Sequence, residues 1–242
     1  MLAKKDEIIL PPFGGAAPEK DSVQTCRSVD GLTEIQSSST ELVIWKRWLP
    51  PQFRDWLDHI PIEVLPDLRL LIKPSELQIA LEPLLDQCGV QAGDMRDLLI
   101  ADLANLIQVF AGITASARVD LRLERVNDDA CWKFHRDSVD ARLITTYRGP
   151  TTEWVKPSHG ERAILEQKEF SGPLERLGAH DVAIFKGSRA SSGNGIVHRS
   201  PPIAGTGCTR LLLCVNQPSA ASPNPWVAGS RNDSHASIKR GW

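Results

Sequence analysis

The sequence has 242 residues, of which 41% are hydrophobic and 24% are charged, and its formal net charge at pH 7 is -2. This composition is typical of a folded soluble protein that is long enough for one large domain or two small ones. A charge so close to zero gives no support to a nucleic-acid or anionic-membrane surface, so we expect neither as a partner.

The start of the chain and the cysteine spacing indicate the compartment. The first apolar run, IIL, ends at Pro11 and is too short for the core of a signal peptide. No stretch is long enough to cross a bilayer. Five cysteines at wide spacing, without a CxxC pair, favour a reducing environment. We therefore expect a cytoplasmic protein.

The first half of the chain predicts helices. Residues 1–40 are polar and rich in Pro, Gly and Ser, which predicts a loose N-terminal arm. Residues 41–113 predict a helical layer whose first helix begins near Pro51. A second helix is expected over KPSELQIALEPLLDQCG and should stop at Gly89. A third is expected over residues 93–112, where apolar residues recur every three or four positions.

After Gly112 the hydrophobic period changes to two. In ARVDLRLER, apolar and charged residues alternate, as in a strand with one wet face. Further short strands are predicted at residues 132–137, 141–147, 153–155, 181–186 and 209–216. Strands without intervening helices predict an antiparallel sandwich or barrel over residues 114–216. The Pro- and Ser-rich residues 217–242 predict a flexible tail.

Four polar residues in the strand-rich half form a candidate metal site. In a strand, His135 and Asp137 would project from the same face, although so short a motif also arises by chance. His198 follows a Gly-rich turn, and Arg210 opens the next apolar strand. Two His and one carboxylate form the facial triad that holds non-haem Fe(II). An Arg can grip a carboxylate through two parallel hydrogen bonds.

These segments carry a resemblance to a known family. The order RVDLRLERVND, HRD, ARLITTY, GAHDVAIFKG, VHRSPP and CTRLLL resembles the double-stranded β-helix of 2-oxoglutarate and Fe(II)-dependent oxygenases, especially the prolyl-hydroxylase-like branch. The resemblance implies that His135, Asp137 and His198 are iron ligands. It also implies that Arg210 binds the distal carboxylate of 2-oxoglutarate, with Tyr147 or Thr145 adding a hydrogen bond.

The whole chain also resembles a bacterial family of unknown function, in which HRDxVxARLITTYRGP and VHRSPP are typical segments. Genes of that family are sometimes found beside genes of zinc-responsive metallochaperones. This resemblance leaves zinc open as the metal and implies a possible link to such metallochaperones as partners.

Two residues offer alternatives within the site. Arg125 is also placed to enter the barrel and is an alternative clamp for the cosubstrate. Cys131 lies four residues before His135, and its thiolate would favour zinc over iron. A buried thiol with no chemical role is the simpler interpretation of Cys131.

The sequence thus predicts an α+β protein in which a helical N-terminal layer packs on a double-stranded β-helix (jelly-roll) barrel. The leading functional hypothesis is an Fe(II)/2-oxoglutarate-dependent dioxygenase, an oxidoreductase that hydroxylates a small molecule or a protein side chain. The alternative is a non-catalytic zinc-binding protein in metal homeostasis that uses the same ligands. The sequence does not name the substrate.

Overall fold

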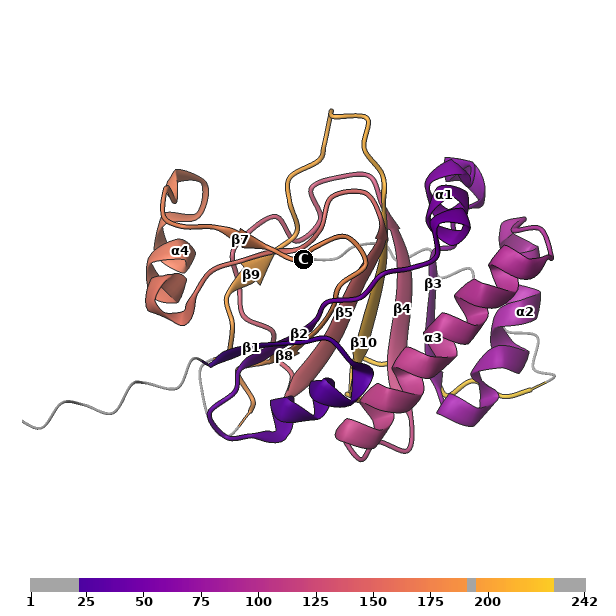
Figure 1. Cartoon of the computed structure of the whole chain (residues 1–242), viewed down its shortest axis with the longest axis horizontal. Coiled ribbons are helices and arrows are strands. Elements are labelled where there is room, and N and C mark those ends of the chain that lie inside the picture. Colours follow the sequence, from indigo (N-terminus) through magenta and orange to yellow (C-terminus); the bar gives the residue numbers. More distant parts are fainter. Residues whose placement is uncertain (1–21, 191–194, 229–242) are drawn as a thin grey trace, which may run out of the picture.

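The computed structural model describes residues 22–190 and 195–228, and Figure 1 shows how their elements are arranged. Residues 1–21 of the expected arm and 229–242 of the expected tail lie outside the described residues. The chain forms a mixed α/β structure in which a large sheet separates a helical layer from a small second sheet (Figure 1).

A seven-stranded sheet organises the fold, in the order β1-β2-β8-β5-β10-β4-β3. Its strands are β1 (Val23–Cys26), β2 (Leu42–Trp45), β3 (Leu68–Ile72), β4 (Val119–Val126), β5 (Ala141–Arg148), β8 (Val182–Lys186) and β10 (Arg210–Asn216). Only β1 and β2 pair in parallel; the other neighbours are antiparallel. The middle strands β5 and β10 are buried along most of their length, which explains their Leu- and Ile-rich sequences.

The second sheet has three short strands, in the order β7 (Glu175–Arg176), β6 (Glu153–Trp154) and β9 (His198–Arg199). One buried apolar cluster joins the two sheets: Phe185 and Leu212 from the large sheet pack in it with Trp154 from the small one. The sheets therefore lie face to face, and the face of the large sheet that looks toward the small one is called the inner face below.

Helices cover the other face of the large sheet. They are α1 (Pro51–His59), α2 (Leu77–Cys88) and α3 (Asp94–Ile113), while α4 (Gly160–Glu166) lies beside the small sheet (Figure 1). Short 3-10 helices are η1 (Val29–Gln36), η2 (Ile62–Val64), η3 (Pro74–Glu76), η4 (Pro157–His159) and η5 (Gln167–Glu169). Phe110 of α3 packs in the same cluster as Leu123 of β4 and Leu213 of β10, so alternate strand residues form the helix-side core.

Several expected elements are present and others differ. The helix at Pro51 begins there, and Gly89 ends α2 in the left-handed conformation with φ of 83°. The expected helical layer, however, contains β2 and β3, because short apolar runs such as LVIW and LRLLI cannot be assigned to helix or strand by periodicity.

The barrel and the two ends of the chain also differ from expectation. The two sheets remain separate ladders within the described residues, and the expected closed barrel is not seen there. Residues 22–36 form β1 and η1 instead of a loose arm. The tail begins attached to the fold, since the Trp226 amide donates to the Leu71 carbonyl at 2.8 Å. In the part of the chain that is described, no helix has the length and apolar character needed to cross a membrane.

Candidate metal centre

Two histidines lie side by side because their backbones are paired. The His135 amide donates to the His198 carbonyl at 3.0 Å, and the His198 amide donates back at 3.0 Å. On its other side, His198 pairs with Trp154 of β6. The two imidazole rings are 4.7 Å apart between centroids. The expected strand at 132–137 is therefore reduced to a single bridge to β9, and this bridge places the two rings together.

Each imidazole is oriented through its Nδ1 atom. The His135 Nδ1 lies 2.8 Å from the Lys133 carbonyl, and the His198 Nδ1 lies 3.1 Å from the Ile196 carbonyl. A carbonyl oxygen can only accept, so both Nδ1 atoms carry the proton and both Nε2 atoms keep a lone pair. A hydrogen bond from Nδ1 to a carbonyl is typical of histidines that bind a metal through Nε2.

Asp137 brings its carboxylate to the two Nε2 atoms. Its Oδ2 lies 3.4 Å from Nε2 of His198, and its Oδ1 lies 3.7 Å from Nε2 of His135. The ligand atoms of the three residues all lie within 4.8 Å of one another. Metal–ligand bonds of about 2.1 Å would set neighbouring ligand atoms about 3.0–3.4 Å apart, so small side-chain adjustments suffice to enclose an ion.

The electrostatics of the cluster favour a cation. Burial lowers the pKa of His198 to about 4, against an opposing effect of the Asp137 charge, so the ring is neutral near pH 7. Its lone pair then faces Asp137 Oδ2, a buried atom that has no hydrogen-bond partner among the described residues. Two acceptors in contact repel each other unless a cation lies between them. The three side chains therefore fit a divalent metal ion.

Asp137 is held in place by a second layer of contacts. Arg142 on β5 donates to Oδ1 through a short hydrogen bond, and its Nε donates to the buried Asn216 at 2.7 Å. The Ser188 amide donates to the Asp137 backbone carbonyl at 2.8 Å. Because Arg142 occupies Oδ1, the free Oδ2 is the atom available to a metal.

Arg210 is a fully buried arginine near the cluster. Its Nη1 donates to Ser200 Oγ at 2.7 Å and its Nη2 to Thr152 Oγ1 at 3.4 Å. No carboxylate of the described residues forms an ion pair with it, and burial lowers its pKa to about 10. An extended chain rises about 3.3 Å per residue, so Ser200 lies about 6.6 Å along the chain from His198. A buried guanidinium whose hydrogen bonds among the described residues go only to hydroxyls fits an anion.

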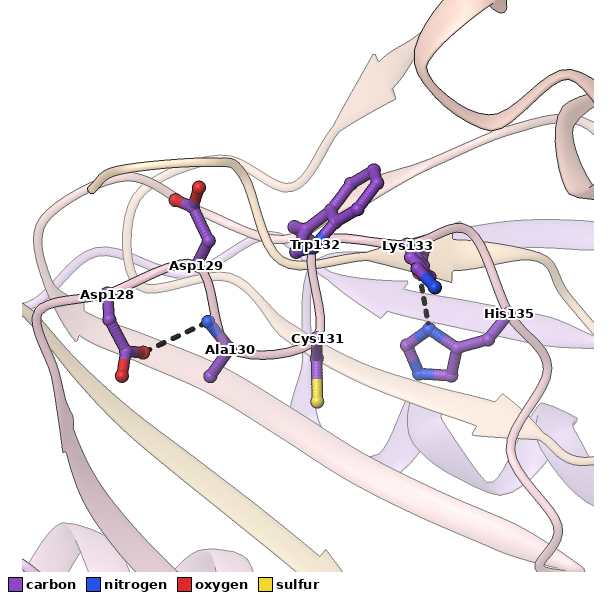
Figure 2. A pocket seen from close by; sticks show the side chains of 7 residues that line it. All are labelled: Asp128, Asp129, Ala130, Cys131, Trp132, Lys133 and His135. Atoms are coloured by element: carbon purple, nitrogen blue, oxygen red, sulfur yellow. Dashed lines mark hydrogen bonds between the residues drawn. The ribbon is translucent and has the colours of Figure 1, made fainter. Parts of the chain in front are cut away.

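The cluster opens to a pocket of about 610 Å³ lined by residues 128–133 and His135. The side chain of His135 is 34% exposed, whereas those of Asp137 and His198 are only 4% and 5% exposed. Figure 2 shows Cys131 and His135 projecting from one side of this loop, and Asp129 and Trp132 from the other. A molecule in the pocket would therefore reach the metal from the His135 side.

The structure does not bring all of the sequence-predicted residues to the cluster. The Tyr147 hydroxyl donates to Asp102 at 2.5 Å and Thr145 to the His180 carbonyl at 3.3 Å, both on the helix side of the sheet. Neither therefore contacts a cosubstrate beside Arg210. Arg125 also points away: it donates to the carbonyls of Ile62 and Glu63 at 2.9 and 3.1 Å.

Cys131, considered from the sequence as a zinc ligand, is exposed and lies outside the three-residue cluster. Although the residue as a whole is exposed, surrounding protein partly desolvates its thiol and, together with the charge of Glu124, raises its pKa, which disfavours the thiolate that zinc would need.

Sequence reasoning missed four polar residues around the site, namely Arg142, Thr146, Thr152 and Ser200. Thr146 lies opposite Leu212 and shares its inner face, while Thr145 lies opposite Leu213 and faces the helices. A shift of one residue reverses the face of a side chain. The signal was present in the alternation along β5, where Arg142 and Thr146 share a face with Ile144.

A family profile described as protein of unknown function (DUF1826) matches residues 27–216. The chain belongs to this family. Membership of a family of unknown function, predicted from the sequence, is thereby confirmed. A search of the curated proteins gives no match.

Among solved structures, the DUF1826 protein is similar to a Pseudomonas putida prolyl-4-hydroxylase, with 12% identity, 79% of this chain and 99% of that chain covered, and a TM-score of 0.39. It is also similar to the Kdo hydroxylase KdoO, a non-heme Fe(II) alphaketoglutarate-dependent dioxygenase, with 11% identity, 81% and 88% coverage, and a TM-score of 0.35. A third is a bsmA homolog from Methylobium petroleophilum, with 12% identity, 84% and 97% coverage, and a TM-score of 0.37.

Proposed function

We propose that this DUF1826 protein is an Fe(II)- and 2-oxoglutarate-dependent oxygenase. The observation that carries the proposal is the unpaired, buried Oδ2 of Asp137, which faces the Nε2 lone pair of His198 with that of His135 nearby. Two imidazoles and one carboxylate are the ligand set of non-haem Fe(II) sites, and they leave coordination positions free.

The protein's own residues would place the cosubstrate. Arg210 would bind the distal carboxylate of 2-oxoglutarate through two parallel hydrogen bonds, with the hydroxyls of Ser200 and Thr152 already oriented toward it. The interval between Ser200 and His198 suits a five-carbon dicarboxylate whose other end reaches the metal. When bound, iron would supply the activation of O2 that hydroxylates a C–H bond, with one oxygen atom entering the product and the other entering succinate as 2-oxoglutarate loses CO2.

The surroundings of the cluster would keep it dry on one side and open on the other. The Phe185 ring packs 4.8 Å from the His198 ring between centroids, and both residues are buried. His135 instead faces the pocket of about 610 Å³. A substrate would approach from the pocket while Phe185 excludes water behind His198.

The proposal is tested by anaerobic calorimetry with Fe(II) and 2-oxoglutarate, followed by a succinate-release assay in air. We expect wild-type protein to bind 2-oxoglutarate only with metal present, and Arg210→Gln to weaken this binding at least about tenfold. Arg125→Gln is the matched control because its side chain points away from the site. Loss of binding in Arg125→Gln but not in Arg210→Gln would identify Arg125 as the clamp instead.

A zinc-binding protein without catalysis is the second candidate. The cluster of two imidazoles and one carboxylate is also a ligand set of zinc. In this case the purified protein would hold zinc tightly and show no affinity for 2-oxoglutarate. Metal analysis of protein purified without added ions, combined with the same calorimetry, separates the two functions.

A further inference from the structure

Trp154 carries a buried hydrogen-bond donor that has no acceptor. It lies on β6, and only 6% of its surface is exposed. Its indole Nε1 is buried and has no hydrogen-bond partner in the part of the chain that the structure describes. An indole N–H can only donate, and buried tryptophans normally find an acceptor for it. An open donor at this depth is therefore a candidate contact for a bound molecule.

Strand pairing places Trp154 beside a histidine of the metal cluster. Trp154 and His198 lie directly opposite each other on β6 and β9. The Val155 amide donates to the Val197 carbonyl at 3.0 Å, so the alternate pair, Trp154 and His198, is not hydrogen-bonded to each other. The side chains of such a pair project from one face, with Cβ atoms about 4.5–5.5 Å apart. The His198 backbone bonds to His135 instead, so both imidazoles and the indole lie in one row.

The same face of the small sheet also contacts Arg210. Thr152 lies two residues before Trp154 and therefore projects from the same side. Its hydroxyl accepts a hydrogen bond from Arg210 at 3.4 Å. Trp154 packs in one apolar cluster with Ile144 of β5 and Leu212 of β10, two strands of the facing sheet. Trp154 thus lies between the sheets, next to the contact of Arg210 on one side and to the metal cluster on the other.

Glu153, on the opposite face of β6, shows the contrast with Trp154. It is also buried, but its Oε1 accepts from Arg176 at 2.8 Å and its Oε2 accepts from Arg199 at 2.7 Å. Between the sheets, Nε1 of Trp154 and Nε of Arg210 both lack an acceptor among the described residues. Neither group can accept a hydrogen bond, so a molecule that satisfies them must supply acceptors. A dicarboxylate supplies them at both of its ends.

We propose that Trp154 binds the cosubstrate by donating its indole N–H to the carboxylate at the metal-side end of 2-oxoglutarate. This inference rests on the proposed function, in which Arg210 binds the distal carboxylate. Trp154 lies opposite His198, so its donor serves the end of the molecule that reaches the metal. A charge-assisted hydrogen bond would fix the orientation of that carboxylate and satisfy a donor that is otherwise unpaired. Trp154 would thus position the cosubstrate without taking part in the oxidation.

The test compares two keto acids that differ at one end. 2-Oxoglutarate has two carboxylates, whereas 2-oxopentanoate keeps the metal-side carboxylate and the keto group but lacks the distal carboxylate. Binding of each acid to the full-length, Fe(II)-loaded protein is measured by anaerobic calorimetry. Trp154→Phe should weaken the binding of both acids by about 10- to 100-fold, as the loss of a hydrogen bond to a charged group would. The preference of this variant for 2-oxoglutarate over 2-oxopentanoate should stay that of wild-type protein.

Two further variants separate the two ends of the cosubstrate from a general effect on the fold. Arg210→Gln should remove the preference for 2-oxoglutarate and leave the binding of 2-oxopentanoate as in wild-type protein. Trp56→Phe is the matched control, because Trp56 lies on α1 and packs against the helix-side core. It should bind both acids as wild-type protein does. The affinity of Trp154→Phe for Fe(II) alone should also be that of wild-type protein, which shows that the metal cluster is intact.

A second measurement uses wild-type protein and needs neither a variant nor turnover. The indole N–H resonance of Trp154 is followed by NMR in Zn(II)-loaded protein, because Zn(II) has no redox chemistry. Each keto acid should move this resonance downfield and slow the exchange of its proton with water. The indole resonance of Trp56 should not move.

Three results would overturn the inference while the proposed function stands. They are an unchanged affinity of Trp154→Phe for both acids, a loss in this variant that is confined to 2-oxoglutarate, and a Trp154 resonance that does not move when 2-oxoglutarate binds. The second result would assign Trp154 to the distal carboxylate. If Trp154→Phe does not fold, the wild-type resonance alone decides. A wild-type protein that binds neither acid would instead contradict the proposed function, and the inference with it.

Discussion

On the helix side of the seven-stranded sheet, Asp102 accepts hydrogen bonds from Arg47 and Tyr147, whereas on the inner face Oδ2 of Asp137 has no partner among the described residues. Eight buried side-chain atoms of the described residues lack a partner, and five of them face the space between the sheets. These five belong to Arg122, Asp137, Thr146, Trp154 and Arg210.

Buried polar groups in proteins are normally paired, so the concentration of unpaired ones on one face has a physical meaning. On the helix side, the network of Asp102, Arg47 and Tyr147 is paired among the described residues, and we expect it to stabilise the fold. On the inner face, five buried polar atoms lack a partner among the described residues, and one of them, Oδ2 of Asp137, lies in a cluster that fits a cation. Under the proposed function, the contrast separates residues that stabilise the protein from residues that bind the metal and the cosubstrate.

The largest expected effect is on the helix side. Asp102→Ala removes the carboxylate that pairs with the buried Arg47, at 2.5 and 3.1 Å, and with Tyr147. Leaving such a charge unpaired costs about 3–5 kcal/mol, so urea unfolding should show a loss of this order. Asp97→Ala, an exposed position on the same helix, should cost under about 1 kcal/mol. Equal losses of stability in the two variants would contradict the conclusion that the Asp102 network stabilises the fold.

Arg142→Gln is expected to weaken metal binding rather than to lower the stability of the fold. Without the guanidinium, Asp137 loses the contact that holds Oδ1. Loss of such a supporting contact weakens metal binding about 10- to 100-fold, which competition against a chromogenic chelator can measure. Arg136→Gln is the control. Arg136 stands between His135 and Asp137 in the sequence, but its side chain donates to Glu161 and to the Gly195 carbonyl. A similar loss in both variants would contradict a specific role for Arg142.

Thr145 and Thr146 are neighbours in β5 whose side chains point to opposite faces of the large sheet, so substituting each in turn compares the two faces. Thr145→Val removes a hydrogen bond to the His180 carbonyl and should cost about 1 kcal/mol. Thr146→Val replaces a buried hydroxyl that has no partner, so the free energy of unfolding should stay the same or rise. Thermal unfolding of the two variants measures the difference, and a larger loss in Thr146→Val would show that its hydroxyl has a partner in the metal-free protein.

The smallest expected effect is a pH dependence that comes from His180. Burial lowers the pKa of His180 below the ordinary 6.5, although the Tyr147 carbonyl opposes this shift. The unfolded chain therefore binds the proton first, and the stability due to neutral His180 is lost as the pH falls below 6.5. Unfolding curves measured from pH 7.5 to 5 should show a shallower decline in His180→Gln. An unchanged slope would mean that His180 is not perturbed.

The sequence indicated the three residues of the His135, Asp137 and His198 cluster better than the residues that surround them. His135, Asp137 and His198 were singled out by residue type and order, and the structure brings their ligand atoms within 4.8 Å. The resemblance also pointed to Arg210. Thr145 and Tyr147 were assigned one residue out of register, because alternation alone does not tell which face of a fully buried strand looks inward.

The fold was predictable where the periodic signal was long and not where it was short. The 20-residue α3 carries a clear helical stripe, and the alternation of β4 is equally plain. β2 and β3, with four and five residues, were hidden in the expected helical layer, because their placement at the sheet depends on contacts with distant β8 and β4. The contact between Arg142 and Asp137 likewise depends on the strand pairing that positions β5.

The central claim is that three side chains from two distant segments bind one divalent metal ion. Anaerobic titration of the metal-free protein with Fe(II), repeated with Co(II) to follow its visible spectrum, tests it most directly. The account predicts one ion per chain for wild-type protein and for Tyr147→Phe, and loss of binding by at least about 100-fold in Asp137→Ala and His198→Ala. A wild-type protein that binds no ion, or variants that bind as tightly as wild type, would contradict it.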